Sequence, residues 1–414
     1  MCGVVSFGTN WAGSYAYRAR ELHRPATVEE LQELVARTPR IRVLGSRHTF
    51  SDIADSDELV SLDALPHDVE VSDGAVSFGA ALRYGDLARI LEAEGLALHN
   101  LASLPHITVA GAVATATHGS GDGNGNLATA GAALELVTSA GEIVRARRGD
   151  PDFDGMVVAL GALGAVTRIT LDAEPAYEVS QRVFEDMAWD TLFEHYDAIT
   201  AAGYSVSIFT LWGDTSSVWV KSRAGDPQEL FGGRPAPVDR HPIPGIDPVN
   251  CTAQLGVPGP WWDRLPHFRM GFTPSAGEEL QSEFLVPRRH AIEAIEAVRP
   301  LASKVQPLLQ VTELRTIAAD RLWMSPQYGQ ATVALHFTWT REPDAVARVL
   351  VDLEAALAPF APRPHWGKAF LADAATVAPR YERLSDFARL AERLDPRGAF
   401  RNDWLASHVL GGEP

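Results

Sequence analysis

The chain has 414 residues, of which 46% are apolar and 21% charged, so it is long enough for two well-buried domains. Its 53 acidic against 36 basic residues give a formal net charge of −17, which argues against a surface that wraps nucleic acid and favours a self-repelling monomer or small oligomer, with a monomer expected. The two cysteines, Cys2 and Cys251, are too few for a disulfide framework or a cysteine-rich zinc site.

The first 176 residues carry many short predicted elements. Thr27 and Glu30 form a capping box for a helix whose apolar face is Leu31, Leu34 and Val35. Alternation and turn signals predict strands at 41–44, 60–62, 96–98 and 165–171, hairpins at 69–78 and 134–147, and helices at 86–94 and 153–160. This order predicts an α+β arrangement rather than regular βαβ repeats.

Longer alternating runs begin after residue 176 and predict a second domain built on an antiparallel sheet. The runs lie at 204–212, 217–221, 279–286, 310–316 and 332–340, with a helix at 289–299 and a long loop at 232–262. The last residues of the chain are predicted to be helical. We therefore expect domains at 1–176 and 177–369 and a C-terminal segment at 370–414.

Neither membrane-spanning nor metal-binding signals are found in the sequence. Every long apolar stretch is broken by charge, glycine or proline, and no cation precedes Arg18, so we expect no signal peptide and a cytosolic protein. No His-x-x-x-His or Cys-x-x-Cys spacing supports a metal site, which disfavours a metal hydrolase.

The stretch from residue 101 to 121 consists almost entirely of small residues. Its glycines and alanines leave backbone amides uncovered, and such a surface suits the close approach of a pyrophosphate. Tight packing of a helix by small residues explains the same composition equally well. No Gly-x-Gly-x-x-Gly after a strand and no P-loop pattern occurs, so a bound nucleotide would require another scheme.

A second candidate lies at residues 45–52, directly after the predicted strand at 41–44. This loop contains a glycine, several hydroxyl groups and one histidine, His48. A lone loop histidine is usually solvated or hydrogen-bonded, so the residues alone leave its role open.

Polar residues occupy one face of two predicted strands in the second domain. Glu313 and Arg315 lie two positions apart in the strand predicted at 310–316 and therefore share a face. In the strand at 332–340 the apolar residues define the core side, and His336 and Thr338 lie on the opposite side. That opposite side is either a solvated surface or the floor of a cavity.

The segment 363–368 is a proline-containing cationic loop that ends in Lys368. It is either a surface turn or part of the same site. Together with Arg315, His336, Glu313 and Thr338, Lys368 would suit a polyhydroxy substrate, because cations favour alkoxide character and a carboxylate accepts hydroxyl hydrogens.

These motifs together resemble the vanillyl-alcohol oxidase superfamily of flavoproteins and, within it, the alditol oxidases. The resemblance rests on residues 45–50, 102–111 and 117–121, and is extended by residues 10–13, 250–252, 257–261 and 364–368. It therefore covers nearly the whole chain. Two positions depart from the family pattern, namely Arg47 before the histidine and Thr49 after it.

The resemblance implies a two-subdomain, PCMH-type FAD-binding domain formed by the N-terminal part and the C-terminal tail, with the substrate domain inserted between them. It implies that His48 is joined covalently to the flavin 8α-methyl group. The implied FAD contacts are Val43, Leu44, Gly45, Ser46, Arg47, His48, Thr49, Ser103, Thr108, Gly111, Ala112, Val113, Ala114, Thr117, Val166 and His365. The implied substrate contacts are Ser103, Glu313, Arg315, Thr338 and Lys368, and the implied catalytic residues are Arg315, Lys368 and His336.

The implied reaction converts the terminal primary alcohol of a polyol such as xylitol or sorbitol to the aldose and reduces O2 to H2O2. Two alternatives stay open at this point. One is a sugar-lactone oxidase or dehydrogenase of the same superfamily. The other is a carbohydrate-binding protein that keeps the fold without catalysis.

Overall fold

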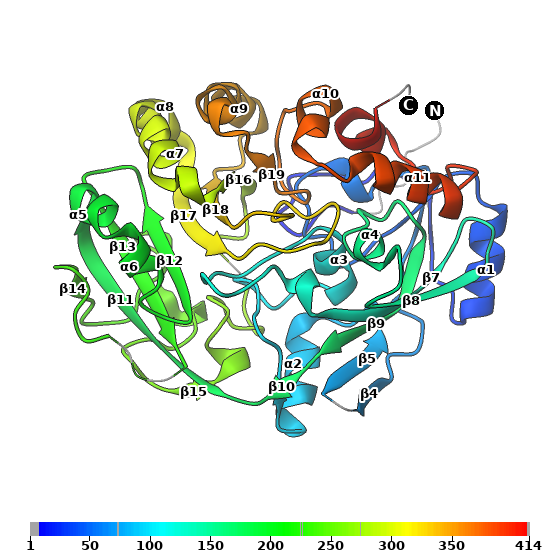
Figure 1. The fold of residues 1–414 in the computed structure, drawn as a ribbon, viewed down its shortest axis with the longest axis horizontal. Coiled ribbons are helices and arrows are strands. Elements are labelled where there is room, and N and C mark those ends of the chain that lie inside the picture. Colours follow the sequence, from blue (N-terminus) through cyan, green and yellow to red (C-terminus); the bar gives the residue numbers. More distant parts are fainter. Residues whose placement is uncertain (1–7, 73, 224, 226, 274, 412–414) are drawn as a thin grey trace.

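The computed structural model describes residues 8–411 except 73, 224, 226 and 274, so Cys2 lies outside the described part of the chain. Within that part, the strands form a nine-stranded sheet, a five-stranded sheet and two smaller sheets of three and two strands. Figure 1 shows the two large sheets side by side in the two halves of the molecule. The mixture of helices with largely antiparallel sheets agrees with the predicted α+β class.

A small parallel sheet precedes the loop that holds His48. Its strands are, in order, β1 (Glu21–His23), β3 (Glu58–Val60) and β2 (Ile41–Val43), and α1 (Val28–Arg37) connects β1 to β2. Thr27 caps α1 as predicted, because the Glu30 amide donates a hydrogen bond to the Thr27 hydroxyl at 3.2 Å. The Glu30 carboxylate accepts from the Ala26 amide at 2.8 Å, so the reciprocal bond of a capping box is displaced by one residue. Since β2 ends at Val43, the following residues leave the sheet as a loop.

The five-stranded antiparallel sheet forms the second part of the N-terminal half. Its order is β4 (Val69–Ser72), β5 (Ala75–Gly79), β9 (Ala165–Asp172), β7 (Gly131–Val137) and β8 (Ile143–Arg147). Its helices are α2 (Tyr84–Ala93), α3 (Val109–Ala114) and α4 (Phe153–Val157). A short antiparallel pair, β6 (Leu96–Ala97) with β10 (Glu174–Pro175), lies where the chain passes to the other half.

The nine-stranded sheet is antiparallel and occupies the other half. Its order is β14 (Arg234–Pro235), β11 (Glu178–Ala188), β13 (Thr215–Ser222), β12 (Ser205–Thr210), β17 (Leu309–Ile317), β18 (Thr332–Trp339), β16 (Leu280–Pro287) and β19 (Arg363–Pro364), and β15 (Gly259–Pro260) pairs with β11. Its helices are α5 (Trp189–Glu194), α6 (Tyr196–Thr200), α7 (Ala291–Val298), α8 (Ala302–Val305) and α9 (Pro343–Leu357), which lie along its outer side in Figure 1.

The C-terminal helices return to the N-terminal half of the molecule (Figure 1). They are α10 (Ala374–Val377), α11 (Leu384–Leu394) and α12 (Asp403–Leu405). The Ile41 amide of β2 donates to the Ala399 carbonyl at 2.8 Å, and the Arg42 guanidinium donates to the Phe400 carbonyl at 2.8 Å. These bonds fasten the end of the chain to the strand that precedes His48.

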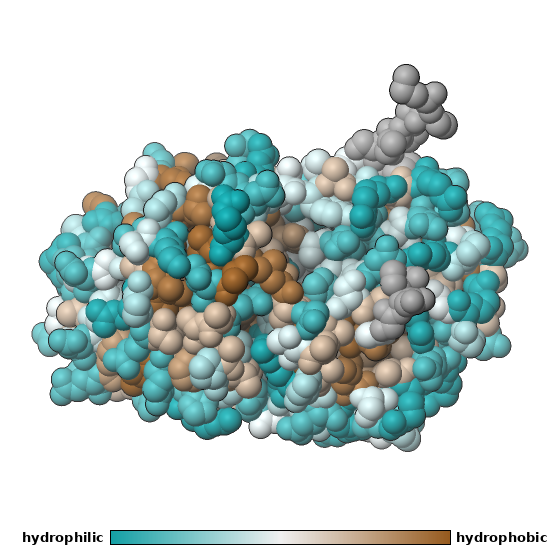
Figure 2. All heavy atoms as spheres, turned by 90° about the horizontal axis from the view of Figure 1, so that it is seen from above, coloured by the Kyte–Doolittle hydropathy of each residue, from teal (hydrophilic) through white to brown (hydrophobic). Residues whose placement is uncertain are grey.

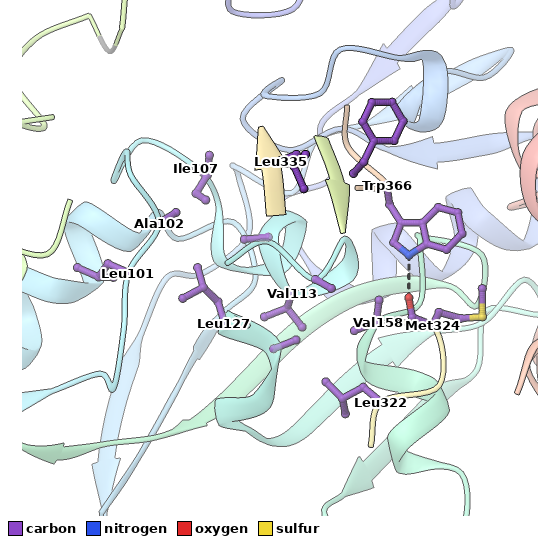
Figure 3. Packing of buried hydrophobic residues seen from close by; sticks show 14 of the residues in the cluster. Leu101, Ala102, Ile107, Val113, Leu127, Val158, Leu322, Met324, Leu335 and Trp366 are labelled. Carbon is purple, nitrogen blue, oxygen red and sulfur yellow. Dashed lines mark hydrogen bonds between the residues drawn. The ribbon is translucent and has the colours of Figure 1, made fainter. Parts of the chain in front are cut away.

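One large hydrophobic cluster of the described residues joins both halves of the molecule. Figure 3 shows part of it, where Val113 of α3 and Leu127 lie near Leu335 of β18 and Trp366. The Trp366 indole donates to the Met324 carbonyl at 2.7 Å, so its polar atom is satisfied inside the core. A shared core of this kind holds the two large sheets in a fixed relation to each other.

The surface seen from above is mostly polar, with apolar side chains gathered on the half that holds the larger sheet (Figure 2). Among the described residues, no helix combines the length and apolar character needed to cross a membrane.

Several predicted boundaries are wrong, and several elements were not predicted, among them β11 and α9. The strand expected at 60–62 is β3 and ends at Val60, and the helix expected at 289–299 becomes α-helical only at Ala291. β11 was missed because a bulge between Phe184 and Met187 interrupts its alternation. α9 was missed although its buried residues recur at helical spacing.

Candidate active site

One cavity of about 380 Å³ lies between the two halves of the molecule and contains residues from both. One end is lined by the loop after β2 and by the segment around α3. The other end is lined by side chains of β16, β17 and β18. The cavity therefore brings the two stretches singled out in the sequence next to the polar face of the second domain.

All but one of the residues expected to contact a cofactor line this cavity. The exception is Val113, which packs into the hydrophobic core beneath α3 (Figure 3). The lining residues are Val43, Leu44, Gly45, Ser46, Arg47, His48, Thr49, Ser103, Thr108, Gly111, Ala112, Ala114, Thr117, Val166 and His365.

Glycines allow the loop after β2 to pack closely against the start of α3. A Cβ on Gly45 would lie 2.7 Å from the Thr108 hydroxyl oxygen, and one on Gly111 would lie 2.9 Å from it. The Thr108 amide donates to the Ser46 hydroxyl at 2.9 Å. Two backbone segments with little side-chain cover thus meet at the cavity wall, and such a cradle fits a pyrophosphate-containing cofactor.

His48 faces this cradle as a neutral imidazole. Burial, followed by the charge of His106, lowers its pKa to about 4. Its Nδ1 is buried and has no hydrogen-bond partner among the described residues. The ring stacks on Trp11 with a centroid distance of 5.4 Å, which limits its rotation. A fixed, uncharged and unpartnered ring nitrogen is the form in which a histidine can form a covalent bond.

Arg47 has a left-handed backbone conformation, with φ of 62°. Its guanidinium lies over the Tyr17 ring, 5.7 Å from the centroid. A non-glycine residue rarely adopts this conformation, so the surroundings of the turn must hold it in place. The turn sets the directions of the neighbouring Ser46 and His48 side chains.

Strand register explains how the opposite wall forms. Glu313 of β17 is paired with His336 of β18, which in turn is paired with Glu283 of β16. Three ionisable side chains therefore lie in a row across neighbouring strands, and all three line the cavity. The next row toward the end of β18 contains Thr338 with Gln281 beside it.

Glu283 is the centre of the ion pairs in this wall. One carboxylate oxygen lies 2.6 Å from Arg315 Nη2, and the other lies 2.7 Å from Lys368 Nζ. Burial alone would raise the pKa of this carboxyl, but the charges of Lys368 and Arg315 hold it well below its usual range. Glu283 is therefore ionised and keeps two cations side by side at the cavity.

Lys368 also defines the state of His336. Burial, followed by the charge of Lys368, lowers the pKa of His336 to about 4, so its ring is neutral at pH 7. Lys368 Nζ lies 2.7 Å from His336 Nδ1, and His336 Nε2 lies 3.1 Å from the Thr338 hydroxyl. An ammonium group can only donate, so Nδ1 accepts from Lys368 and Nε2 carries the hydrogen.

Arg315 connects this wall to the N-terminal half. Its Nη1 donates to the Ser103 hydroxyl at 3.2 Å, and its Nε lies 3.6 Å from Glu313 Oε2. The five residues expected to contact substrate, Ser103, Glu313, Arg315, Thr338 and Lys368, thus share one end of the cavity. The segment 363–368 is not a surface turn, because Arg363 and His365 are buried.

The lining residues that were not predicted include Glu283, Gln281, His118 and His267. A charged residue within the apolar run of β16 was the available signal for Glu283, since such a position requires a buried partner. His118 lies within the motif at 117–121, which was the available signal for it, whereas His267 occurs in a loop without a recognisable motif.

Metal binding at this wall is disfavoured. Among the described residues, His118, Glu283 and His365 place possible ligand atoms within 4.8 Å of one another. Arg315 and Lys368 already engage both oxygens of Glu283, and their positive charges oppose a metal ion. A second group of possible ligands lies at the small parallel sheet and does not belong to the cavity. It consists of Glu21, His23 and Glu58.

Two family models match the chain. The FAD binding domain family matches residues 20–147, and the D-arabinono-1,4-lactone oxidase family matches residues 277–408. The first range contains the loop with His48 and α3, and the second contains Glu283, Glu313, Arg315, His336 and Lys368.

Curated relatives match over almost their full length. An alditol oxidase of a Streptomyces species is 51% identical over 97% of this chain and 99% of its own. An L-gulono-1,4-lactone dehydrogenase of Mycobacterium tuberculosis is 28% identical over 97% of this chain and 99% of its own. An L-gulonolactone oxidase of Bos taurus is 23% identical over 96% of both chains.

Among solved structures, cholesterol oxidase from Brevibacterium sterolicum has a similar fold, with a TM-score of 0.79 and 13% identity over 97% of this chain and 96% of that chain. At this level of identity the likeness concerns the fold alone. Together with the FAD binding domain match, it confirms the predicted α+β, PCMH-type FAD-binding fold.

Proposed function

The chain belongs to the alditol oxidase family of FAD-dependent oxidoreductases, and we propose that it oxidises the terminal primary alcohol of alditols such as xylitol and sorbitol to the aldose. The observation that carries this substrate assignment is the wall in which Arg315 and Lys368 lie beside Glu313, Ser103 and Thr338. Paired cations with hydroxyl and carboxylate groups can bind several hydroxyl groups at once.

The two cations bind the reacting oxygen in this proposal. Loss of hydride from an alcohol carbon is helped when the hydroxyl gains alkoxide character, and positive charge within a dry cavity stabilises that form. Arg315 and Lys368 are held for this task by Glu283. When bound, FAD supplies the hydride acceptor at N5 and passes the electrons to O2, which gives H2O2.

The hydroxyl proton leaves through Lys368 and His336. His336 Nδ1 already accepts a hydrogen bond from Lys368 Nζ, so a proton taken from the substrate by Lys368 can be passed to His336 in one concerted shift. Glu313 accepts hydrogen bonds from hydroxyl groups farther along the polyol.

In this proposal, the cofactor is held by the cradle that the loop after β2 forms with the start of α3. The backbone at 45–49 and 111–114 would bind the pyrophosphate, and His48 would be joined covalently to the flavin 8α-methyl group. The proposal also includes a substrate domain at 177–369 inserted between residues 1–176 and 370–414, and a cytosolic monomer. The hydrogen bonds from the C-terminal segment to β2 support the proposed division into domains, because they join residues 370–414 to the N-terminal part of the chain.

The covalent link is tested by acid precipitation of the purified protein. We expect a yellow pellet and a colourless supernatant for the unsubstituted protein. His48→Ala should release the colour into the supernatant or lose it altogether, because the only attaching nitrogen is removed. His67→Ala, on an exposed loop, serves as the matched control and should stay yellow in the pellet. Colour that stays in the His48→Ala pellet would contradict the tether.

The substrate is tested by anaerobic flavin reduction. Xylitol should bleach the flavin, and readmitted air should restore its absorbance with formation of peroxide. A sugar lactone is the second candidate, since residues 277–408 match a lactone oxidase family. Bleaching by an aldonolactone but by no polyol would replace the first assignment with the second. A flavin that neither compound bleaches would contradict both.

A further inference from the structure

His267 belongs to a loop and not to the strands that carry the predicted substrate residues. Its side chain nevertheless contacts one of those residues, Glu313, directly. Its Nε2 lies 3.1 Å from Glu313 Oε1, and both side chains are buried. Burial, followed by the charge of Lys221, lowers the pKa of His267 to about 4. Burial alone would raise the pKa of the Glu313 carboxyl, but the charge of Arg315 and the hydrogen bond from His267 together hold it below its usual range. A carboxylate can only accept, so the neutral imidazole donates from Nε2 to Glu313.

The backbone of His267 is fixed from several directions. Its amide donates to the Ser103 carbonyl at 2.8 Å, and its carbonyl accepts from the Thr252 amide at 2.9 Å. The buried Lys221 donates to the carbonyl oxygens of Leu265 and Pro266, the two residues before it. These hydrogen bonds restrain the backbone from Leu265 to His267, and so they fix where the imidazole begins.

These contacts close a ring around one end of the cavity. Arg315 donates to the Ser103 hydroxyl, the Ser103 carbonyl accepts from the His267 amide, and the His267 ring donates to Glu313. Glu313 lies beside Arg315 again, with 3.6 Å between Oε2 and Nε. His267 is thus the link between Ser103 and Glu313, which are on opposite halves of the molecule.

We propose that His267 is a positioning residue that fixes the orientation of the Glu313 carboxylate and thereby makes the enzyme discriminate polyols by a hydroxyl remote from the reacting carbon. This inference rests on the proposed function. Glu313 has no other hydrogen-bond donor at a bonding distance among the described side chains, because the Arg315 Nε contact is too long. Without the imidazole N–H, the carboxylate loses its anchor while the cations that bind the reacting oxygen stay in place.

The test compares two substrates in His267→Phe by anaerobic flavin reduction. The aromatic ring should fit, because His267 packs edge to face against Phe209 and Trp219, each with a centroid distance of 5.4 Å. We expect kcat/KM for xylitol to fall by about 10–100-fold, mainly through KM, since a hydrogen bond to a charged group is lost. Activity with 1,2-propanediol, which has no remote hydroxyl, should stay nearly unchanged.

Conservative and double variants separate positioning from a general structural effect. His267→Gln can place an amide N–H where Nε2 lies and should restore most of the discrimination. In a Glu313→Ala background, His267→Phe should have little further effect, because the oxygen that accepts from the imidazole is already gone. If His267→Phe does not fold, His267→Asn, whose shorter amide does not reach Glu313, replaces it.

The inference is overturned if xylitol and propanediol lose kcat/KM by the same factor, or if His267→Phe has its full effect in the Glu313→Ala background. Absence of flavin reduction by any polyol in the unsubstituted protein would overturn the proposed function, and this inference with it. The two failures are distinguishable, because the second is visible before any substitution is made.

Discussion

The buried charges at the cavity balance one another residue by residue. Glu283 and Glu313 carry two negative charges, and Arg315 and Lys368 carry two positive ones, all within one wall. His336 and His267 stay neutral, because burial lowers the pKa of each to about 4. A balanced set of charges can be buried at moderate cost, whereas removal of one member leaves its partner uncompensated.

Lys368 provides the clearest test at this scale. Lys368→Met keeps the length of the side chain and removes a charge that the proposed function places next to the reacting oxygen. We expect the limiting rate of flavin reduction by xylitol to fall by about 10²–10³-fold, the usual cost of losing one group that stabilises a developing oxyanion. Stopped-flow reduction measures this rate. Lys304→Met, on the surface where Lys304 pairs with Asp352 at 2.7 Å, is the matched control. An unchanged limiting rate in Lys368→Met would refute its role.

Elements contribute to the site by bringing backbone together as well as side chains. β16, β17 and β18 place Glu283, His336 and Glu313 in one row by register. On the opposite wall, the loop after β2 and the start of α3 approach so closely that Gly45 has no room for a side chain. The same closeness leaves backbone amides available to a cofactor.

Gly45→Ala should therefore weaken cofactor loading without unfolding the protein. Its new Cβ would lie 2.7 Å from the Thr108 hydroxyl oxygen, so the two segments must separate at a cost of about 1–3 kcal/mol. The ratio of flavin to protein absorbance measures loading and should fall. Gly123→Ala is the control, because a Cβ there has no neighbour within 4 Å among the described residues. Equal loading of both variants would contradict the cradle.

At the scale of the whole molecule, the shared core and cavity bury several histidines. A histidine whose folded pKa lies below its unfolded value takes up a proton on unfolding over the interval between the two values. For His267 and His336 this interval runs from about 6.5 down to about 4, and burial is the first cause of both shifts. Their full contribution to stability is present above pH 6.5 and is lost as the pH falls through 4.

We therefore expect the free energy of unfolding to decrease between pH 6.5 and pH 4, by about 1.4 kcal/mol per pH unit for each of these histidines. Urea unfolding at a series of pH values measures this slope. His267→Phe should make the slope shallower by about one proton, since one titrating group is removed. A free energy of unfolding that does not change from pH 7 to pH 5 would contradict the prediction.

The sequence by itself determined the features that depend on local pattern. Alternation along 310–316 and 332–340 assigned Glu313, Arg315, His336 and Thr338 to faces, because side chains of a strand alternate whatever the strand pairs with. The capping box of α1 was predicted for the same local reason. The family motifs predicted that the loop of His48 and the small-residue stretch contact the cofactor, and both lie within the residues that match the FAD binding domain family.

Tertiary structure alone decided which of these strand faces and loops meet at the cavity, and which further residues lie beside them. Glu283 enters the site through its pairing with His336, 53 positions away by their numbers, and no local pattern encodes such a register. His267 reaches Glu313 only because its loop is tied to Ser103 and Lys221, and Val113 leaves the cavity because α3 directs it into the core. Contacts between distant segments depend on how the whole chain packs, and therefore appear only in the folded molecule.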